Sequence, residues 1–225
     1  MKITAMIPAR SGSKGLPDKN IKKLCGRPLM DYAIKAAKGC KKIDRVFLNS
    51  DSHDYLRLGV KLGAEEFYRH ERLAQDDVSM KEVLVDFISA MKLCEEPPDA
   101  IIVLYPTYPL RTSEDLTDII EVFGDLSEDS LIGVKEPDTH PYLCYKNCNK
   151  WTPVLNPNPD KYYRRQLYPD YLEISHWACI FSTKAIYTLN AQLMCSDTFS
   201  YMIPNKVVDI DTLEDFEYAE YLMRK

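Results

Sequence analysis

Three cations lie close together near the start of the chain. Arg10, Lys14 and Lys19 fall within a glycine- and serine-containing loop at residues 7–20, directly after an apolar run that predicts a buried strand over residues 2–9. Glycines let a backbone approach a ligand closely and turn its N–H groups toward it. A loop of this kind after a first parallel strand suits a polyphosphate. The chain as a whole has a formal charge of −5, so this positive cluster is local.

The loop does not match the standard nucleotide signatures. It lacks the G-x-x-x-x-G-K-[ST] of P-loop proteins and the G-x-G-x-x-G of dinucleotide-binding folds. Its cations, with a proline that stiffens the loop, favour a reaction in which phosphate charge must be neutralised. The alternative is a solvated basic turn, and composition alone leaves both interpretations open.

A pair of carboxylates near the end of the sequence is the second candidate for chemistry. Residues 206–210 predict a strand, and residues two apart in a strand point to the same side. Asp209 and Asp211 would then present two carboxylates toward one point, with Ile210 buried behind them. Mg²⁺ is usually held by one or two carboxylates plus substrate phosphates. The alternative is that Asp211 caps the helix that follows, because aspartate is a favoured N-cap residue.

The elements that must position these groups alternate along the chain. Apolar runs predict strands over residues 2–9, 45–50, 65–68, 100–105, 130–134, 177–181 and 206–210. Apolar residues at helical spacing predict helices over residues 29–38, 54–62, 79–93, 113–123 and 212–224. This alternation predicts a three-layer α/β fold, with a mostly parallel sheet covered by helices on both faces. Ligands of such sheets bind beyond the carboxyl ends of the strands.

Residues 136–174 interrupt the alternation. They are rich in proline, tyrosine and asparagine, and no helical stripe is present. We predict hairpins and extended arms inserted into a single domain that spans residues 1–225. Exposed tyrosines in an insertion often mark a partner surface.

Composition excludes several classes of partner. The acidic balance argues against a general nucleic-acid binder or a binder of anionic membranes. No apolar run approaches the length of a membrane span, and the first residues show no signal peptide. The seven cysteines include no C-x-x-C pair, which favours free thiols in a reducing cytoplasm. Cys144 and Cys148, with His140 nearby, have a spacing that fits a zinc site poorly, so structural cysteines are the preferred interpretation.

The order of residues in the opening loop resembles the N-terminal signature of the cytidylyltransferases that activate nonulosonic acids. These are the CMP-sialic acid synthetases and their CMP-Kdo synthetase relatives. The likeness continues in Lys-Leu-Cys-Gly-Arg-Pro-Leu at 23–29, Pro-Thr-x-Pro-Leu-Arg at 106–111 and Asp-Ile-Asp-Thr at 209–212. The resemblance implies a Rossmann-like nucleotidyltransferase fold in which residues 136–174 build a homodimer.

The resemblance also implies substrates, a cofactor and site residues. CTP and a sugar acid would be the substrates and Mg²⁺ the cofactor, held by Asp209 and Asp211. The catalytic residues would be Arg10, Lys14, Lys19, Asp209 and Asp211. The nucleotide-binding residues would be Ala9, Arg10, Ser11, Gly12, Ser13, Asn20, Asp51, Arg69 and Ser79. Alternatively, Ser79 is only a helix cap, in a capping box with Glu82, and Arg69 is a solvated arginine.

The acceptor side departs from the family pattern. The sugar-binding positions would be Tyr105, Thr107 and His176, and Tyr105 stands where the family usually has glutamine. Leu143 stands where a lysine is common, and residues 172–178 replace the usual Arg-x-Asn-Gly-Ala. The alternatives are therefore transfer to a different sugar or from a different base, or a non-catalytic nucleotide-binding paralogue.

Overall fold

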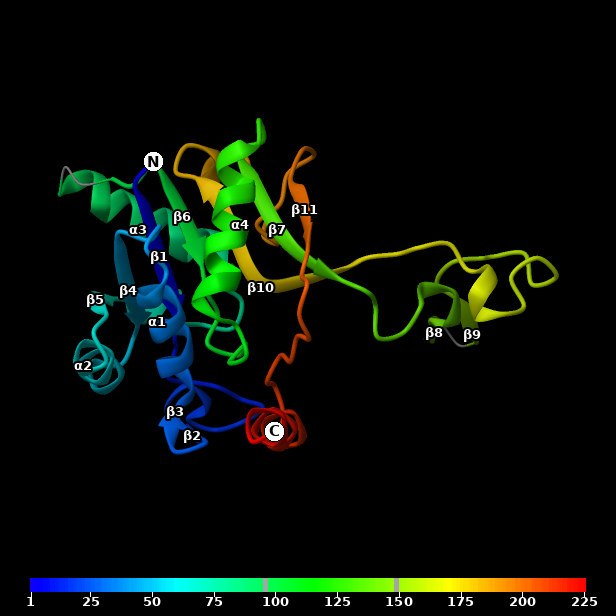
Figure 1. Ribbon diagram of the computed structural model, residues 1–225, viewed down its shortest axis with the longest axis horizontal. Coiled ribbons are helices and arrows are strands. Elements are labelled where there is room, and N and C mark those ends of the chain that lie inside the picture. The colour runs from blue at the N-terminus through cyan, green and yellow to red at the C-terminus, as the bar shows by residue number, and fades with distance from the viewer. Residues whose placement is uncertain (95–96, 148–149) are drawn as a thin grey trace.

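The computed structural model describes residues 1–94, 97–147 and 150–225 and is built on a seven-stranded sheet (Figure 1). In spatial order the strands are β11 (Phe199–Met202), β7 (Ser130–Lys135), β10 (Glu173–Ser182), β6 (Ala100–Val103), β1 (Ile3–Pro8), β4 (Arg45–Ser50) and β5 (Glu65–Tyr68). Strands β6, β1, β4 and β5 are parallel, as are β11 and β7. Strand β10 runs antiparallel to both β6 and β7. This is the mostly parallel α/β sheet that the sequence predicts.

Helices cover both faces of the sheet and make the predicted three layers. The helices are α1 (Leu29–Gly39), α2 (His53–Lys61), α3 (Met80–Leu93), α4 (Ser113–Asp125) and α5 (Leu213–Met223). Because alternate strand residues point to opposite faces, Ala5 and Ile7 of β1 pack with α1 and α4. Met6, between them, packs with the buried face of α3 on the other side. The sheet is therefore buried from both sides.

Capping boxes mark where three of these helices begin. Ser79, Thr112 and Thr212 each accept a hydrogen bond from a backbone N–H in the first turn and form capping boxes with an acidic residue three positions on. The cap of α5 is thus Thr212 and not Asp211. Asp211 lies just outside the helix, and its backbone N–H donates to Asp215.

The predicted strand at residues 206–210 is wrong. This segment is extended but pairs with no strand of the sheet as far as the chain is described. Val208 and Ile210 are nevertheless buried, in a small cluster with Phe216 of α5 and Leu24 of the hairpin β2 (Lys23–Leu24) and β3 (Arg27–Pro28). The alternating burial that suggested a strand comes from packing against this cluster.

The segment between β7 and β10 leaves the body of the protein as a long arm (Figure 1). It contains η3 (Pro141–Leu143), the antiparallel hairpin of β8 (Tyr145–Asn147) and β9 (Trp151–Pro153), and η4 (Arg165–Leu167). His140 packs against three tyrosine rings of the arm, which are Tyr142, Tyr168 and Tyr171. The insertion expected at residues 136–174 thus corresponds to an arm that carries a hairpin, and its role in dimerisation stays a prediction.

The structure describes six of the seven cysteines for which free thiols were predicted. The six cysteines in the described ranges, Cys25, Cys40, Cys94, Cys144, Cys179 and Cys195, are free. Cys148, considered with Cys144 and His140, lies outside the described residues. No helix among the described residues is long and apolar enough to cross a bilayer.

Candidate active site

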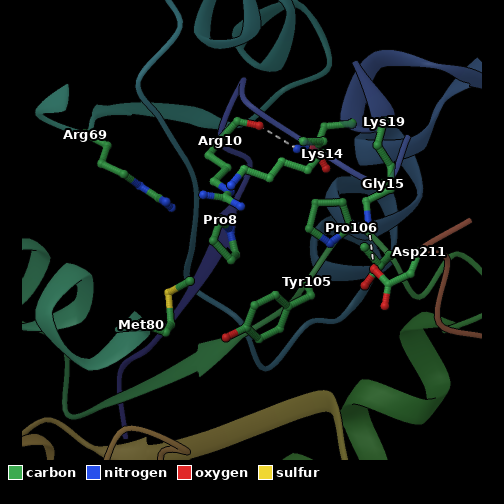
Figure 2. A pocket seen from close by; sticks show the side chains of 13 residues that line it. Pro8, Arg10, Lys14, Gly15, Lys19, Arg69, Met80, Tyr105, Pro106 and Asp211 are labelled. Carbon is green, nitrogen blue, oxygen red and sulfur yellow. Dashed lines mark hydrogen bonds and ion pairs between the residues drawn. The ribbon is translucent and has the colours of Figure 1, made fainter. Parts of the chain in front are cut away.

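A cavity of about 440 Å³ lies beyond the carboxyl ends of β1 and β6, where parallel sheets bind ligands (Figure 2). Its size is in the range of small-molecule sites. It is lined by Pro8, Arg10, Ser13, Lys14, Gly15, Lys19, Asn20, Arg69, Met80, Tyr105, Pro106, Thr107 and Asp211. The cations of the opening loop, the segment after β6 and one C-terminal carboxylate therefore share a single cavity.

Lys19 joins the opening loop to the C-terminal segment. Its Nζ donates to Oδ1 of Asp211 at 2.8 Å and to the carbonyl oxygen of Ile210 at 2.6 Å. Gly15 permits this contact, since a Cβ at that position would lie 2.6 Å from the carbonyl oxygen of Asp211. The glycine is thus needed for close approach of two backbones at the edge of the cavity.

Two further contacts hold the opening loop on its other side. Asp51, after β4, accepts hydrogen bonds from both the backbone N–H and the hydroxyl of Ser11, at 2.9 and 2.7 Å. The hydroxyl of Tyr55 in α2 donates to Asp18 at 3.0 Å. Asp51 therefore shapes the loop and does not itself line the cavity.

The carboxylate of Asp76 bridges two cations of the loop, Arg10 and Lys14. Asp76 places Oδ1 2.8 Å from Arg10 and pairs through Oδ2 with Lys14. These two cations hold the pKa of Asp76 below its ordinary value. The acidic pair Asp76-Asp77 was visible in the sequence, but its distance along the chain from the loop gave no indication of this contact.

Arg69 is a buried cation on the wall of the cavity. It is 3% exposed, and its guanidinium donates to the side-chain oxygen of Asn49 at the end of β4. Burial lowers the pKa of Arg69 to about 10, because desolvation disfavours the charged form. The interpretation of Arg69 as a solvated arginine is therefore wrong.

Tyr105 lies across the cavity from Arg10 and Lys14 (Figure 2). Burial raises the pKa of its phenol, so the hydroxyl is neutral and able to donate a hydrogen bond. Its backbone carbonyl accepts a hydrogen bond from Arg111, which also donates to the carbonyl of Trp177 in β10. Arg111 is 4% exposed and joins β10 to the end of β6 from inside the fold.

Asp209 opens into a neighbouring cavity and not into the one that holds Asp211. This second cavity, of about 490 Å³, is also lined by His176, Lys135, Lys206 and Tyr108 among others. The hydroxyl of Tyr108 donates to Oδ2 of Asp209 at 2.8 Å. The rings of Tyr105 and His176 lie 5.9 Å apart, edge to face, between the two cavities. The two carboxylates do not converge as a strand would have placed them.

The remaining predicted nucleotide contacts lie near the cavity but do not line it. Ala9, Ser11 and Gly12 belong to the same loop and are absent from the lining residues. Ser79 is the cap of α3, and its hydroxyl pairs with Glu82 at 2.8 Å. The next residue, Met80, lines the cavity instead, and nothing in the helical pattern distinguished it from a core methionine.

The structure has close neighbours among proteins of known fold. It matches CMP:2-keto-3-deoxy-manno-octonic acid synthetase complexed with CTP with a TM-score of 0.71 over 100% of this chain and 99% of that chain, at 16% identity. At that identity the match shows the fold alone, which is the Rossmann-like fold of nucleotidyltransferases.

Sequence comparison then defines the family. A cytidylyltransferase family model matches residues 4–225. N-acylneuraminate cytidylyltransferase of Streptococcus agalactiae serotype III (strain NEM316) is 32% identical over 220 residues, which are 96% of this chain and 52% of that protein. Pseudaminic acid cytidylyltransferase of Campylobacter jejuni subsp. jejuni serotype O:2 is 29% identical over 228 residues, which are 100% and 97% of the two chains. The chain belongs to the cytidylyltransferase family, and it spans about half the length of the first of these relatives.

Proposed function

We propose that this chain transfers a cytidylyl group from CTP to a nonulosonic, sialic-acid-like sugar acid. The observation that carries the proposal is the cavity itself, in which Lys14, Lys19 and Asp211 meet beyond the carboxyl ends of the strands. Relatives named for the activation of N-acylneuraminate and of pseudaminic acid support the choice of substrates.

The reaction joins two anionic substrates, so positive charge is needed to offset the repulsion between them. The anomeric hydroxyl of the sugar acid attacks the α-phosphorus of CTP and releases its proton to solvent. A phosphorus–oxygen bond forms as the bond to the β-phosphate breaks, and pyrophosphate leaves with the electron pair. Arg10, Lys14 and Lys19 bind the phosphates and stabilise charge that develops during transfer.

The carboxylate oxygens of Asp209 and Asp211 are ligands of the kind that Mg²⁺ prefers. Asp211 lines the cavity proposed for CTP, and Asp209 lies two residues before it and accepts a hydrogen bond from the hydroxyl of Tyr108. Mg²⁺ in proteins is usually held by one or two carboxylates together with substrate phosphates. A divalent ion bound there would supply charge neutralisation on the phosphates.

The acceptor is proposed to lie on the side of Tyr105, Thr107 and His176. Thr107 and Tyr105 line the cavity that also holds Lys14 and Lys19, and His176 lines the neighbouring cavity that also holds Lys135. Lysine and histidine side chains beside a neutral phenol could receive the carboxylate and hydroxyl groups of a sugar acid. The departures at Leu143 and at residues 172–178 then affect which sugar acid is accepted.

The assembly and compartment are also proposals. The arm exposes large apolar side chains, including Trp151 at 72% and Tyr163 at 65%, which suits a homodimer interface. Free cysteines and the absence of any observed disulfide among the described residues suit the cytoplasm.

Release of pyrophosphate tests the proposal. The protein is mixed with CTP and each of a panel of nonulosonic acids, with and without Mg²⁺, and pyrophosphate is measured over time. We expect metal-dependent release with at least one sugar acid and strong loss in Asp211→Asn. No release with any acceptor would refute the catalytic proposal, while preferred binding of a purine triphosphate would refute the choice of CTP.

A further inference from the structure

The carboxylate of Asp76 contacts two cations of the cavity, Arg10 and Lys14, as an anionic ligand would. One oxygen pairs with Arg10 and the other with Lys14. The ends of these two side chains lie next to each other at the cavity wall (Figure 2). A phosphate group, which has several anionic oxygens, can make the same two charge-assisted contacts. Asp76 therefore occupies the positions on Arg10 and Lys14 that a phosphate group would take.

Asp76 belongs to a lightly anchored segment. It lies between η2 (Glu71–Leu73) and α3, and its side chain is 49% exposed. In the described structure no backbone N–H of residues 75–77 donates a hydrogen bond. The flanks are fixed, because Leu73 is buried and Ser79 caps α3. Residues 75–77 can therefore move without disturbing the helix or the sheet.

The two ion pairs of Asp76 affect which ligands can bind Arg10 and Lys14. The carboxylate neutralises one of the two positive charges, and both ion pairs must break before a phosphate group can contact both cations. A ligand with a single weak negative charge gains little from that exchange. A polyphosphate brings more charge than the carboxylate and gains more.

We infer that Asp76 is a specificity-determining residue that occupies the phosphate positions on Arg10 and Lys14 until a polyphosphate displaces it. The inference rests on the proposed binding of CTP in this cavity. Any phosphate that binds Arg10 and Lys14 must first break the ion pairs of Asp76, which costs binding free energy. Cytidine has no phosphate and does not incur this cost.

Calorimetric titration of variants with a ligand series tests the inference. Asp76→Asn removes the negative charge but keeps the shape of the side chain. Asp77→Asn is the matched control, since Asp77 is adjacent, exposed and makes no ion pair within the described residues. Asp76→Glu keeps the charge and serves as the conservative variant. The ligands are cytidine, inorganic pyrophosphate and CTP.

We expect Asp76→Asn to bind CTP and pyrophosphate about threefold to fivefold more tightly than the wild type, the range of exposed ion pairs. Cytidine should bind all variants equally, and Asp77→Asn and Asp76→Glu should resemble the wild type. Unchanged or weaker CTP binding by Asp76→Asn, or an equal gain in Asp77→Asn, would overturn the inference alone. Failure of the wild type to bind CTP would overturn the proposed function as well.

Discussion

The Nζ of Lys19 lies 2.8 Å from Oδ1 of Asp211, although the two residues are 192 positions apart in the sequence. The lysine side chain is only 13% exposed, while the carboxylate is 74% exposed. The pair thus holds the C-terminal segment against the opening loop and leaves Asp211 open to solvent at the cavity. The site depends on this contact between the two ends of the fold.

Replacement of Lys19 should lower catalytic activity strongly. Lys19→Met removes a cation from the proposed phosphate site and releases Asp211, so we expect kcat/KM for CTP to fall about a hundredfold. Lys42→Met is the matched control, because Lys42 forms a pair of 3.0 Å with Glu121 far from the cavity. Steady-state kinetics that show equal effects of the two changes would contradict the role of Lys19.

Gly15 should not tolerate a side chain. Gly15→Ala places a Cβ 2.6 Å from the carbonyl oxygen of Asp211, so the loop and the C-terminal segment must move apart. We expect the free energy of unfolding to fall by about 1–3 kcal/mol, the usual cost of overpacking. Gly12→Ala in the same loop meets nothing within 4 Å and supplies the control. Urea denaturation of both variants measures the difference, and similar losses would refute the steric argument.

Burial of Cys179 should make the folded protein less stable at alkaline pH. Desolvation raises the pKa of this thiol to about 12, so the unfolded chain loses the proton at lower pH than the folded protein. Because the folded state then binds more protons, stability falls as pH rises from about 9 toward 12. Cys179→Ala should lessen that fall in denaturation curves measured across this range. A slope identical to that of the wild type would contradict the assignment, and the exposed Cys94→Ala provides the comparison.

Tyr105 should act on the acceptor and not on the nucleotide. Tyr105→Ala removes both the hydroxyl and the ring that contacts His176, so we expect KM for the sugar acid to rise about tenfold with KM for CTP little changed. Tyr105→Phe keeps the ring and separates the two contributions. Initial-rate measurements with each substrate varied in turn distinguish them. A rise confined to KM for CTP would place Tyr105 on the nucleotide side.

The sequence predicts the scaffold well where local chemistry determines it. The capping box of Ser79 and Glu82 placed the start of α3, and the continuous apolar run at 100–105 placed β6 within the sheet. The prediction of a strand at 206–210 failed because Val208 and Ile210 are buried by α5 and a hairpin, and alternate burial alone does not require a strand partner. Strand β11 was missed because it lies at the edge of the sheet, with Phe199 and Met202 exposed.

The candidate site was predicted only in part for a similar reason. The loop cations were recognisable as neighbours in sequence, and Asp211 was found through a motif. The bridge from Asp76 to Arg10 and Lys14 and the separation of Asp209 from Asp211 depend on tertiary packing between distant segments. Spacing along a strand could not reveal them, because the segment that carries the two aspartates is not a strand.

A crystal structure of the protein with CTP and Mg²⁺ tests the central claim most directly. We predict a triphosphate in the cavity of Lys14 and Lys19, with phosphate oxygens within hydrogen-bond distance of both ammonium groups and the metal ion at Asp211. A nucleotide bound elsewhere on the protein, with this cavity left empty of phosphate, would contradict the account.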